Sequence, residues 1–215
     1  MSKLTLYVGN KNYSSWSFRP WLALEACGIE FEDVVIPFDF AAGNPKIRDI
    51  SPTGRVPVLE HGDIRVWESL AIIEYVAELY PQAGLWPQDS GERAAARSYS
   101  MEMLSGFRAL RSACPMNIRR EKRAIDLPEG VMEDVARIET IWREAVARSG
   151  GPFLFGRFSA VDAMFAPVVN RFEIYDLTRN PGSLEYMDAV KTHPAFRKWQ
   201  EAALKESWIV PEDEV

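Results

Sequence analysis

The chain has 215 residues, of which 47% are hydrophobic, and it carries a formal net charge of −6 at pH 7. This hydrophobic content is typical of a packed globular protein with one large domain or two small ones, and it excludes a disordered chain. The acidic balance argues against a general nucleic-acid-binding surface.

Cysteine and histidine are both scarce. The two cysteines, Cys27 and Cys114, form no Cys-x-x-Cys motif, and the two histidines are His61 and His193. We therefore expect no metal site, and we expect a reducing compartment. No apolar segment is long enough to span a bilayer, and no basic head with an apolar run marks a signal peptide. These features predict a cytoplasmic protein that binds neither membranes nor nucleic acid.

The first third of the chain alternates between strand and helix patterns. Apolar side chains at every second position predict a strand over residues 3–8. A helix is predicted to follow and to end near Gly28, with Ser17 as its N-cap and Pro20 in its first turn. A second strand is predicted over residues 31–36.

The next segment predicts a β-hairpin followed by a helix. A short helix over residues 45–50 leads to a strand that reaches Glu60, and the turn His61-Gly62-Asp63 joins it to a strand over residues 64–67. A helix over residues 69–79 ends before Pro81. The predicted order is βαβαββα, with the first strand pair parallel and the last pair antiparallel.

The composition changes after Tyr80, and no strand pattern follows. Residues 82–90 are typical of a linker. Helices are predicted over residues 91–113, 129–147, 183–191 and 194–205, and another is predicted to begin at Ser159. Ser159 and Asp162 have the spacing of a capping box, with Asp in place of Glu. The second half is therefore predicted to be all-helical.

Three hydroxyl groups gather where the first strand leads into the first helix. They belong to Ser14, Ser15 and Ser17. A helix N-terminus has unpaired N–H groups and a partial positive charge, so it favours an anion such as a ligand thiolate. The alternative is that these serines are ordinary helix caps, because serine is common at that position.

Four motifs occur in a fixed order along nearly the whole chain. They are the Ser-Ser-x-Ser segment at 14–17, Pro-Thr-Gly-Arg-Val-Pro at 52–57, Trp-Glu-Ser-Leu-Ala-Ile-Ile-Glu-Tyr at 67–75 and Ser-x-x-Asp at 159–162. With them the chain resembles the cytosolic-type glutathione S-transferases. The resemblance implies an α/β thioredoxin-like domain over residues 1–81, with a mixed four-stranded sheet that binds glutathione. It also implies an all-α C-terminal domain over residues 91–215 that receives an electrophile.

The serine segment is most similar to that of serine-type transferases, in particular the zeta class with its Ser-Ser-Cys-Ser signature. Ser14 aligns with the catalytic serine of the family, and Ser15 and Ser17 are nearby alternatives. Trp16 replaces the signature cysteine, so the substrate of the zeta class cannot be assigned to this chain from the motif. Tyr7 lies in the preceding strand, where we interpret it as structural. Cys27 lies at the far end of the helix, where packing is its expected role.

The resemblance also implies how glutathione is held. Val56 and Pro57 match the cis-proline position, where the backbone of Val56 pairs with the cysteinyl unit of glutathione as a short added strand. Ser69 and its N–H are expected to bind the γ-glutamyl carboxylate, and Glu68 its ammonium group. Capping of the helix is the alternative for both. Further glutathione-binding residues implied by the resemblance are Lys46 and Arg55.

The second-substrate pocket is expected near the end of the first C-terminal helix. Arg108, Arg111 and Met116 are its predicted residues, with Arg119 and Arg120 close by in the sequence. An arginine cluster there favours an anionic electrophile, and the alternative is a solvated helix face. Four phenylalanines are predicted to belong to the core, namely Phe153, Phe155, Phe158 and Phe165.

Three function classes follow from these residues. The first is a glutathione S-transferase that uses glutathione as co-substrate, holds no permanent cofactor and attacks a small electrophile. The second is an enzyme that uses glutathione as a cofactor, such as a maleylacetoacetate isomerase-like cis–trans isomerase, a dehalogenase or a peroxidase. The third is a glutathione-fold interaction protein without turnover, which would not need an intact ligand site. The resemblance also implies a homodimer.

Overall fold

The computed structural model describes residues 3–215. Its first half contains β1 (Leu4–Val8), α1 (Ser15–Ala26), β2 (Glu32–Val35), α2 (Pro45–Ile50), β3 (Val58–His61), β4 (Ile64–Trp67) and α3 (Ser69–Leu79). The strands form one four-stranded sheet in the order β2-β1-β3-β4. β1 runs parallel to β2 and antiparallel to β3, and β3 pairs antiparallel with β4. The predicted βαβαββα order and mixed sheet are therefore confirmed.

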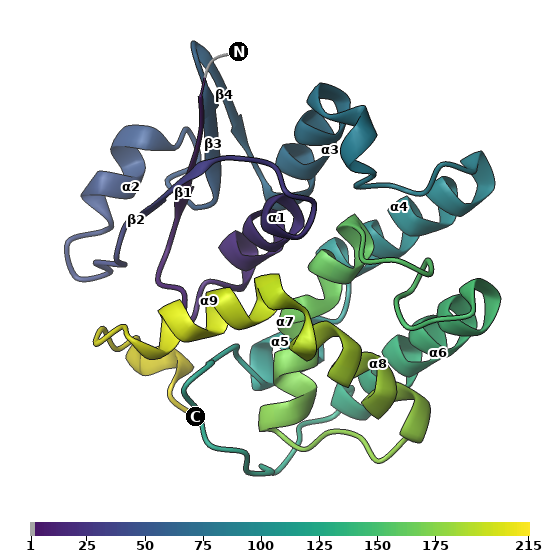
Figure 1. Ribbon diagram of the computed structural model, residues 1–215. Helices are drawn as coiled ribbons and strands as arrows, with labels where there is room; N and C mark the ends of the chain where they lie inside the picture. Colours follow the sequence, from purple (N-terminus) through teal and green to yellow (C-terminus); the bar gives the residue numbers. More distant parts are fainter. Residues whose placement is uncertain (1–2) are drawn as a thin grey trace.

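The two faces of the sheet are covered differently. Figure 1 shows α1 and α3 on one face and α2 on the other. The alternation in β1 explains the packing, because Leu4, Leu6 and Val8 are buried while the residues between them are partly exposed. Leu6 lies opposite Leu59 of β3, and both side chains are fully buried. Burial of such apolar side chains contributes about 1.5–3 kcal/mol each.

The second half of the chain is helical. It consists of α4 (Ser90–Ser105), α5 (Arg108–Ala113), α6 (Val131–Ser149), α7 (Ala160–Ile174), α8 (Pro181–Thr192) and α9 (Pro194–Leu204), with the 3₁₀ turns η1 (Pro81–Ala83) and η2 (Pro211–Asp213). Asp89 caps α4 by accepting the Glu92 N–H at 2.8 Å. Most of these helices match the sequence prediction within two residues at their N-termini.

The prediction of one long helix over residues 91–113 is wrong, because the structure has two helices there, α4 and α5. A Cβ on Gly106 would lie 2.7 Å from the carbonyl oxygen of Glu102, so the turn at the end of α4 requires glycine. Phe107 then adopts a left-handed conformation with φ of 54° and is 6% exposed. Burial of the Phe107 ring offsets the backbone strain and redirects the chain into α5.

The two halves share one hydrophobic core, and α1 lies at their junction. Phe18 of α1 stacks on Trp199 of α9 with ring centroids 4.8 Å apart, and Phe196 packs edge-on at 5.3 Å. Trp21 meets Trp199 from the next turn at 5.1 Å. The N-terminus of α1, with its serines, is thereby held against the helical half.

The start of α7 is a closed polar cluster inside this core. Asp162 accepts hydrogen bonds from the Ser159 N–H and hydroxyl, both at 2.9 Å. It also accepts the Leu154 N–H at 3.0 Å and the Tyr186 hydroxyl at 3.2 Å. The predicted capping pair is confirmed, and the structure adds two partners that no local pattern indicated. The N–H groups of Ser159 and Ala160 at this helix start both find acceptors, the first on Asp162 and the second on the Leu85 carbonyl.

Candidate functional site

The serine segment forms the start of α1, although not as the sequence predicted. The helix begins at Ser15, Ser14 occupies the N-cap position, and the prediction of Ser17 as N-cap is wrong. Ser17 is fully buried inside the helix, where its Oγ accepts the Gly9 N–H at 3.1 Å and the Ser14 hydroxyl at 2.7 Å. Ser14 is 6% exposed. The two hydroxyls therefore form a short hydrogen-bonded chain, with Ser14 at its outer end.

Pro20 lies inside α1 rather than in its first turn, which corrects a second prediction. Because proline has no N–H, the carbonyl of Trp16 lacks its usual helical donor. The Ser69 hydroxyl takes that place and donates to the Trp16 carbonyl at 2.7 Å. This bond joins the first turn of α1 to the start of α3, and it directs the Ser69 hydroxyl into the protein.

The first cavity, of about 320 Å³, opens at the start of α1. Its lining includes Ser14, Ser15, Val56, Arg111, Met116 and Arg171. Phe38 and Phe40 from the loop after β2 form an apolar wall and stack on each other with centroids 5.2 Å apart. The structure thus brings two of the predicted serines together with residues of the helical half.

A second cavity of about 230 Å³ is also lined by Trp16. Glu68, Val56 and Pro57 line it, and the Val56–Pro57 peptide bond is cis, as the resemblance implied. Trp16, Arg55, Val56 and Arg111 line both cavities, so the two spaces adjoin. A larger groove of about 840 Å³ lies away from these residues, along Lys3, Glu25 and Lys198.

Four predicted residues do not line either cavity. Lys46 is exposed on α2, although its neighbour Ile47 faces the first cavity, and Arg108 is exposed on α5. Ser69 is 1% exposed and points to Trp16 as described above. Ser17 reaches the first cavity only through Ser14.

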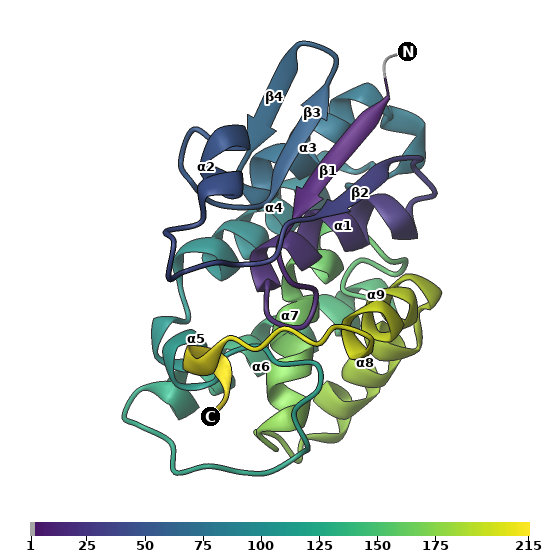
Figure 2. The same cartoon turned by 90° about the vertical axis from the view of Figure 1, so that its left-hand side faces the viewer.

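Arg119 and Arg120 have another role, because they hold the C-terminal segment. Arg119 donates to the Trp208 carbonyl at 2.7 Å, and Arg120 donates to the Val215 carbonyl at 2.8 Å. The carboxylate of Glu206 accepts the N–H groups of Lys11 at 2.7 Å and Asn12 at 3.0 Å, immediately before the serine segment. Figure 2 shows this segment running from α9 across to α5. The end of the chain therefore supports the loop that carries the site.

Arg171 of α7 is a site residue that the sequence analysis missed. It is 5% exposed and lines the first cavity, and it donates to the carbonyls of Cys114 at 2.8 Å and Pro167 at 3.2 Å. Burial, aided by the charge of Arg111, lowers the pKa of Arg171 to about 10, so the side chain stays charged at neutral pH. An arginine that closely follows the apolar run at 164–169 in α7 was the signal in the sequence that could have indicated it.

Positive charge surrounds Trp16. The guanidinium carbon of Arg19 lies 4.3 Å from the Trp16 ring centroid, and that of Arg111 lies 4.7 Å from it. Arg19 is fully buried and donates to the Ser15 carbonyl at 2.8 Å. Burial, together with the charges of Arg171 and Arg111, lowers the pKa of Arg19. No carboxylate among residues 3–215 lies within 4 Å of these three guanidinium groups, so the region favours an anion.

One carboxylate shares the first cavity with Arg171. Asp213, in η2 near the end of the chain, lines the same space and is half-buried. Burial raises the pKa of Asp213, while the charge of Arg171 lowers it. The two groups therefore line one cavity and influence each other's pKa.

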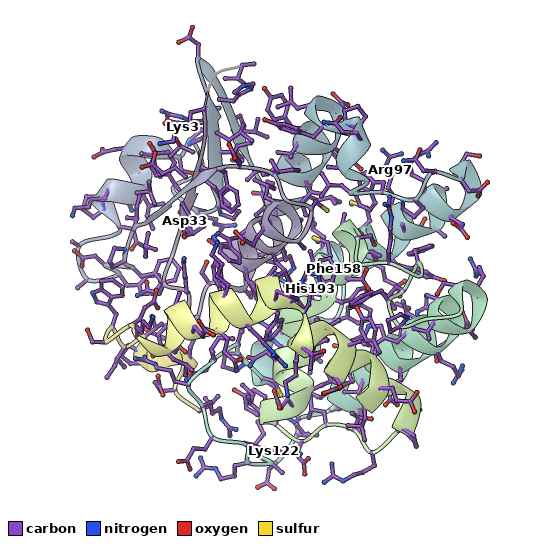
Figure 3. The ribbon with its side chains drawn as sticks, viewed as in Figure 1. Lys3, Asp33, Arg97, Lys122, Phe158 and His193 are labelled. Atoms are coloured by element: carbon purple, nitrogen blue, oxygen red, sulfur yellow. The ribbon has the colours of Figure 1, made fainter. Side chains whose placement is uncertain are left out.

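Other candidates from the sequence are structural. The Tyr7 hydroxyl donates to Glu60 at 2.9 Å on the sheet, away from both cavities. Cys27 packs against the core, and burial raises the pKa of its thiol to about 11. Phe165 is fully buried, and Phe158 lies against His193 with ring centroids 4.4 Å apart, as Figure 3 shows. The core position predicted for Phe165 is confirmed, whereas Phe153, Phe155 and Phe158 are half-buried and pack against the core.

Neither a metal-binding cluster nor a membrane-spanning helix occurs in the part of the chain that the structure describes. Within residues 3–215, no group of three or more His, Cys, Asp or Glu side chains is placed to hold a metal ion. Over the same residues, no helix combines the length and apolar character that crossing a membrane requires.

Comparison with known proteins agrees with this architecture. The glutathione S-transferase N-terminal domain family matches residues 13–79, and the corresponding C-terminal domain family matches residues 118–202. Glutathione S-transferase 1 of Dianthus caryophyllus is 34% identical over 58% of this chain and 56% of its own length. The probable maleylacetoacetate isomerase of Caenorhabditis elegans is 28% identical over 90% of this chain and 91% of its own.

The fold comparison extends over nearly the whole chain. A glutathione transferase homolog from Burkholderia GL BGR1, solved with bound glutathione, superposes with a TM-score of 0.74. It is 23% identical and covers 96% of this chain and 100% of its own. The fold is thus a thioredoxin-like domain joined to a helical domain. The chain belongs to the glutathione S-transferase family.

Proposed function

We propose that this protein is a glutathione transferase in which Ser14 stabilises the thiolate of glutathione. Residues 1–81 would form the glutathione-binding domain and residues 91–215 the helical domain, joined by the linker at 82–90. The observation that carries the proposal is the convergence of Ser14, Val56 and Glu68 on two adjoining cavities. The bound glutathione of the Burkholderia homolog supports the same ligand.

Each part of glutathione has a group to meet in this arrangement. The backbone of Val56 is available to the cysteinyl unit, and Glu68 is available to the γ-glutamyl ammonium. The Ser14 hydroxyl donates to Ser17 Oγ at 2.7 Å. A hydroxyl proton can rotate toward a better acceptor, so a thiolate bound in the first cavity would take the Ser14 proton in place of the neutral Ser17 oxygen.

The chemistry is attack by the thiolate on an electrophilic carbon. The sulfur lone pair forms the new C–S bond, and a leaving group departs with the electron pair of the bond that breaks. A free thiol has a pKa of about 8.5, so little thiolate exists at neutral pH without stabilisation. The Ser14 hydrogen bond and the buried charges of Arg19 and Arg171 both favour the charged form.

The electrophile that we propose carries an anionic group. Arg171 is the reason, because its charge is buried at the wall of the first cavity and is bonded to two carbonyls rather than to a carboxylate. A buried charge without an ionic partner is costly, and a substrate carboxylate would compensate it. Met116 lines the same space and would contact the rest of the substrate.

A pair of electrophiles that differ in charge tests this proposal. Glutathione would be supplied with 4-chloro-3-nitrobenzoate or with its neutral methyl ester, and chloride would leave from each. We expect a higher kcat/KM for the anion, and we expect Arg171→Met to remove that preference while turnover of the ester remains. Arg108→Met is the matched control, because Arg108 is exposed and lines neither cavity. If the Arg171→Met protein prefers the anion over the ester as strongly as the wild type does, the assignment is contradicted.

A glutathione-dependent isomerase is the second candidate. It is favoured by the match to the probable maleylacetoacetate isomerase over 90% of this chain. An isomerase returns glutathione unconsumed, whereas a transferase consumes one thiol per product. Titration of free thiol during turnover therefore distinguishes the two activities.

We also propose a cytoplasmic homodimer. Both cysteines are free, which fits a reducing compartment. Ile64 and Trp67 on β4 are 50% and 41% exposed, and Met101 on α4 is 48% exposed. Large exposed apolar side chains of this kind are typical of a surface that a second copy covers.

A further inference from the structure

The Ser69 hydroxyl, predicted to bind glutathione, is already engaged. It donates to the Trp16 carbonyl at 2.7 Å, and Ser69 is 1% exposed and lines neither cavity. A hydroxyl has one proton, so Ser69 cannot donate to a carboxylate while this bond exists.

The bond between Ser69 and Trp16 is required by the sequence of α1. Pro20 lies where the helix would otherwise supply an N–H to the Trp16 carbonyl. Release of the Ser69 hydroxyl would leave that carbonyl without a donor inside the protein, which is unfavourable. The carboxylate of a γ-glutamyl group therefore needs a different side-chain donor.

Arg111 is placed to supply it. The side chain lines the second cavity together with Glu68, and it stacks on Trp16. Its Nη1 donates to the carbonyls of Leu104 at 3.2 Å and Gly106 at 3.0 Å. Within residues 3–215, its Nε and Nη2 donate to no protein group. The backbone turn at Gly106 thus fixes one edge of the guanidinium and leaves the other edge available.

The second cavity therefore presents a cation and an anion to the same ligand. Glu68 supplies the carboxylate, and Arg111 supplies the guanidinium. An α-amino acid group, with an ammonium and a carboxylate on one carbon, is the ligand chemistry that this pair fits. Arg55 also lines the cavity, but it is exposed, and no side-chain contact among the described residues orients it.

We propose that Arg111 binds the α-carboxylate of the γ-glutamyl group of glutathione while Glu68 binds its ammonium. The inference rests on the proposed function, because it assumes glutathione as the ligand. It reassigns Arg111 from the second-substrate pocket to the recognition of glutathione, and it places a glutathione-binding residue in the helical half of the chain. Ser69 becomes a residue that joins α1 to α3.

Glutathione and an analogue without the α-carboxylate, 4-aminobutyryl-Cys-Gly, test this assignment by calorimetry. The wild type should bind glutathione roughly 10- to 100-fold more tightly than the analogue, as expected for a lost hydrogen bond to a charged group. Arg111→Met should bind both equally, with the affinity of the wild type for the analogue. Arg111→Lys should keep part of the preference, and Arg108→Met on the same helix should keep all of it.

Each result decides the matter. If Arg111→Met still prefers glutathione over the analogue as strongly as the wild type does, the inference is overturned. It is also overturned if Ser69→Ala or Arg55→Met, each with Arg111 intact, loses the preference for glutathione. Failure of the wild type to bind glutathione overturns the proposed function as well as this inference. Binding and turnover with an unchanged preference in Arg111→Met overturn the inference alone. If Arg111→Met does not fold, Arg111→Lys gives the decision, because its reduced preference is expected only for direct contact.

Discussion

Removing the carboxylate of Asp162 should destabilise the protein by an amount that depends on pH in a defined direction. In Asp162→Ala, the N–H groups of Leu154 and Ser159 and the hydroxyls of Ser159 and Tyr186 lose their acceptor. Four buried donors left unpaired cost about 4–12 kcal/mol in all. Burial raises the pKa of Asp162 from 3.8 to about 6 despite these hydrogen bonds, so the wild type holds a carboxylate at neutral pH at some cost.

That cost determines the net effect at neutral pH. A pKa raised by about two units means that burying the charged carboxylate costs about 3 kcal/mol, and Asp162→Ala removes this cost. The free energy of unfolding should therefore fall by about 1–9 kcal/mol in the variant near pH 7.5. Because the folded-state pKa is raised, the contribution of Asp162 is fully present below its unfolded pKa and is lost as the pH rises through about 6. The difference between wild type and variant should thus grow by about 2 kcal/mol between about pH 7.5 and about pH 4.5.

Urea unfolding of both proteins in the same buffers measures this difference. The other titrating groups contribute about equally to the unfolding free energy of both proteins, so their effect largely cancels. A difference that shrinks toward low pH would refute the reasoning. It would mean that the four hydrogen bonds outweigh burial and hold the pKa of Asp162 below its usual value.

Three further outcomes follow from other contacts. Ser159→Ala removes one hydrogen bond to Asp162 and should lower stability by about 0.5–2 kcal/mol without changing glutathione affinity, as thermal unfolding and calorimetry would show. The reverse pattern would contradict a structural role for Ser159. Arg119→Met removes the bond to the Trp208 carbonyl and should speed proteolytic removal of the C-terminal segment; unchanged cleavage would show that this bond does not hold the segment. Sedimentation velocity at micromolar concentration should show a dimer that Trp67→Lys converts to monomer, and a monomeric wild type would exclude the proposed assembly.

Periodic patterns predicted most of the fold because they report local physics. The alternation in β1 and the Ser159–Asp162 spacing each depend on neighbouring residues, and both are observed in the structure. The break at Gly106 was missed because it depends on burial of Phe107, which is a tertiary effect. The motif residues around Val56 were identified through the family resemblance rather than from their own pattern.

The site was less predictable because its residues meet only in three dimensions. Arg171 lies 157 positions after Ser14 in the chain, and no local spacing joins them, yet both line the first cavity. Ser69 was predicted from its place at a helix start, but the carbonyl left free by Pro20 takes its hydroxyl. The sequence shows which polar groups are present, whereas their hydrogen-bond partners depend on tertiary packing.

The pKa of the bound thiol in wild type and in Ser14→Ala tests the central claim most directly. Ultraviolet thiolate absorbance of bound glutathione would be followed against pH in both proteins, together with the rate of turnover. Ser14 at the outer end of the hydroxyl chain should supply most of a lowering of about two units, or about 2.7 kcal/mol. We therefore predict that Ser14→Ala raises the pKa of the thiol toward its free value and cuts turnover strongly, while glutathione still binds. The same thiol pKa and rate in Ser14→Ala would contradict the account and direct attention to Ser15 or Ser17.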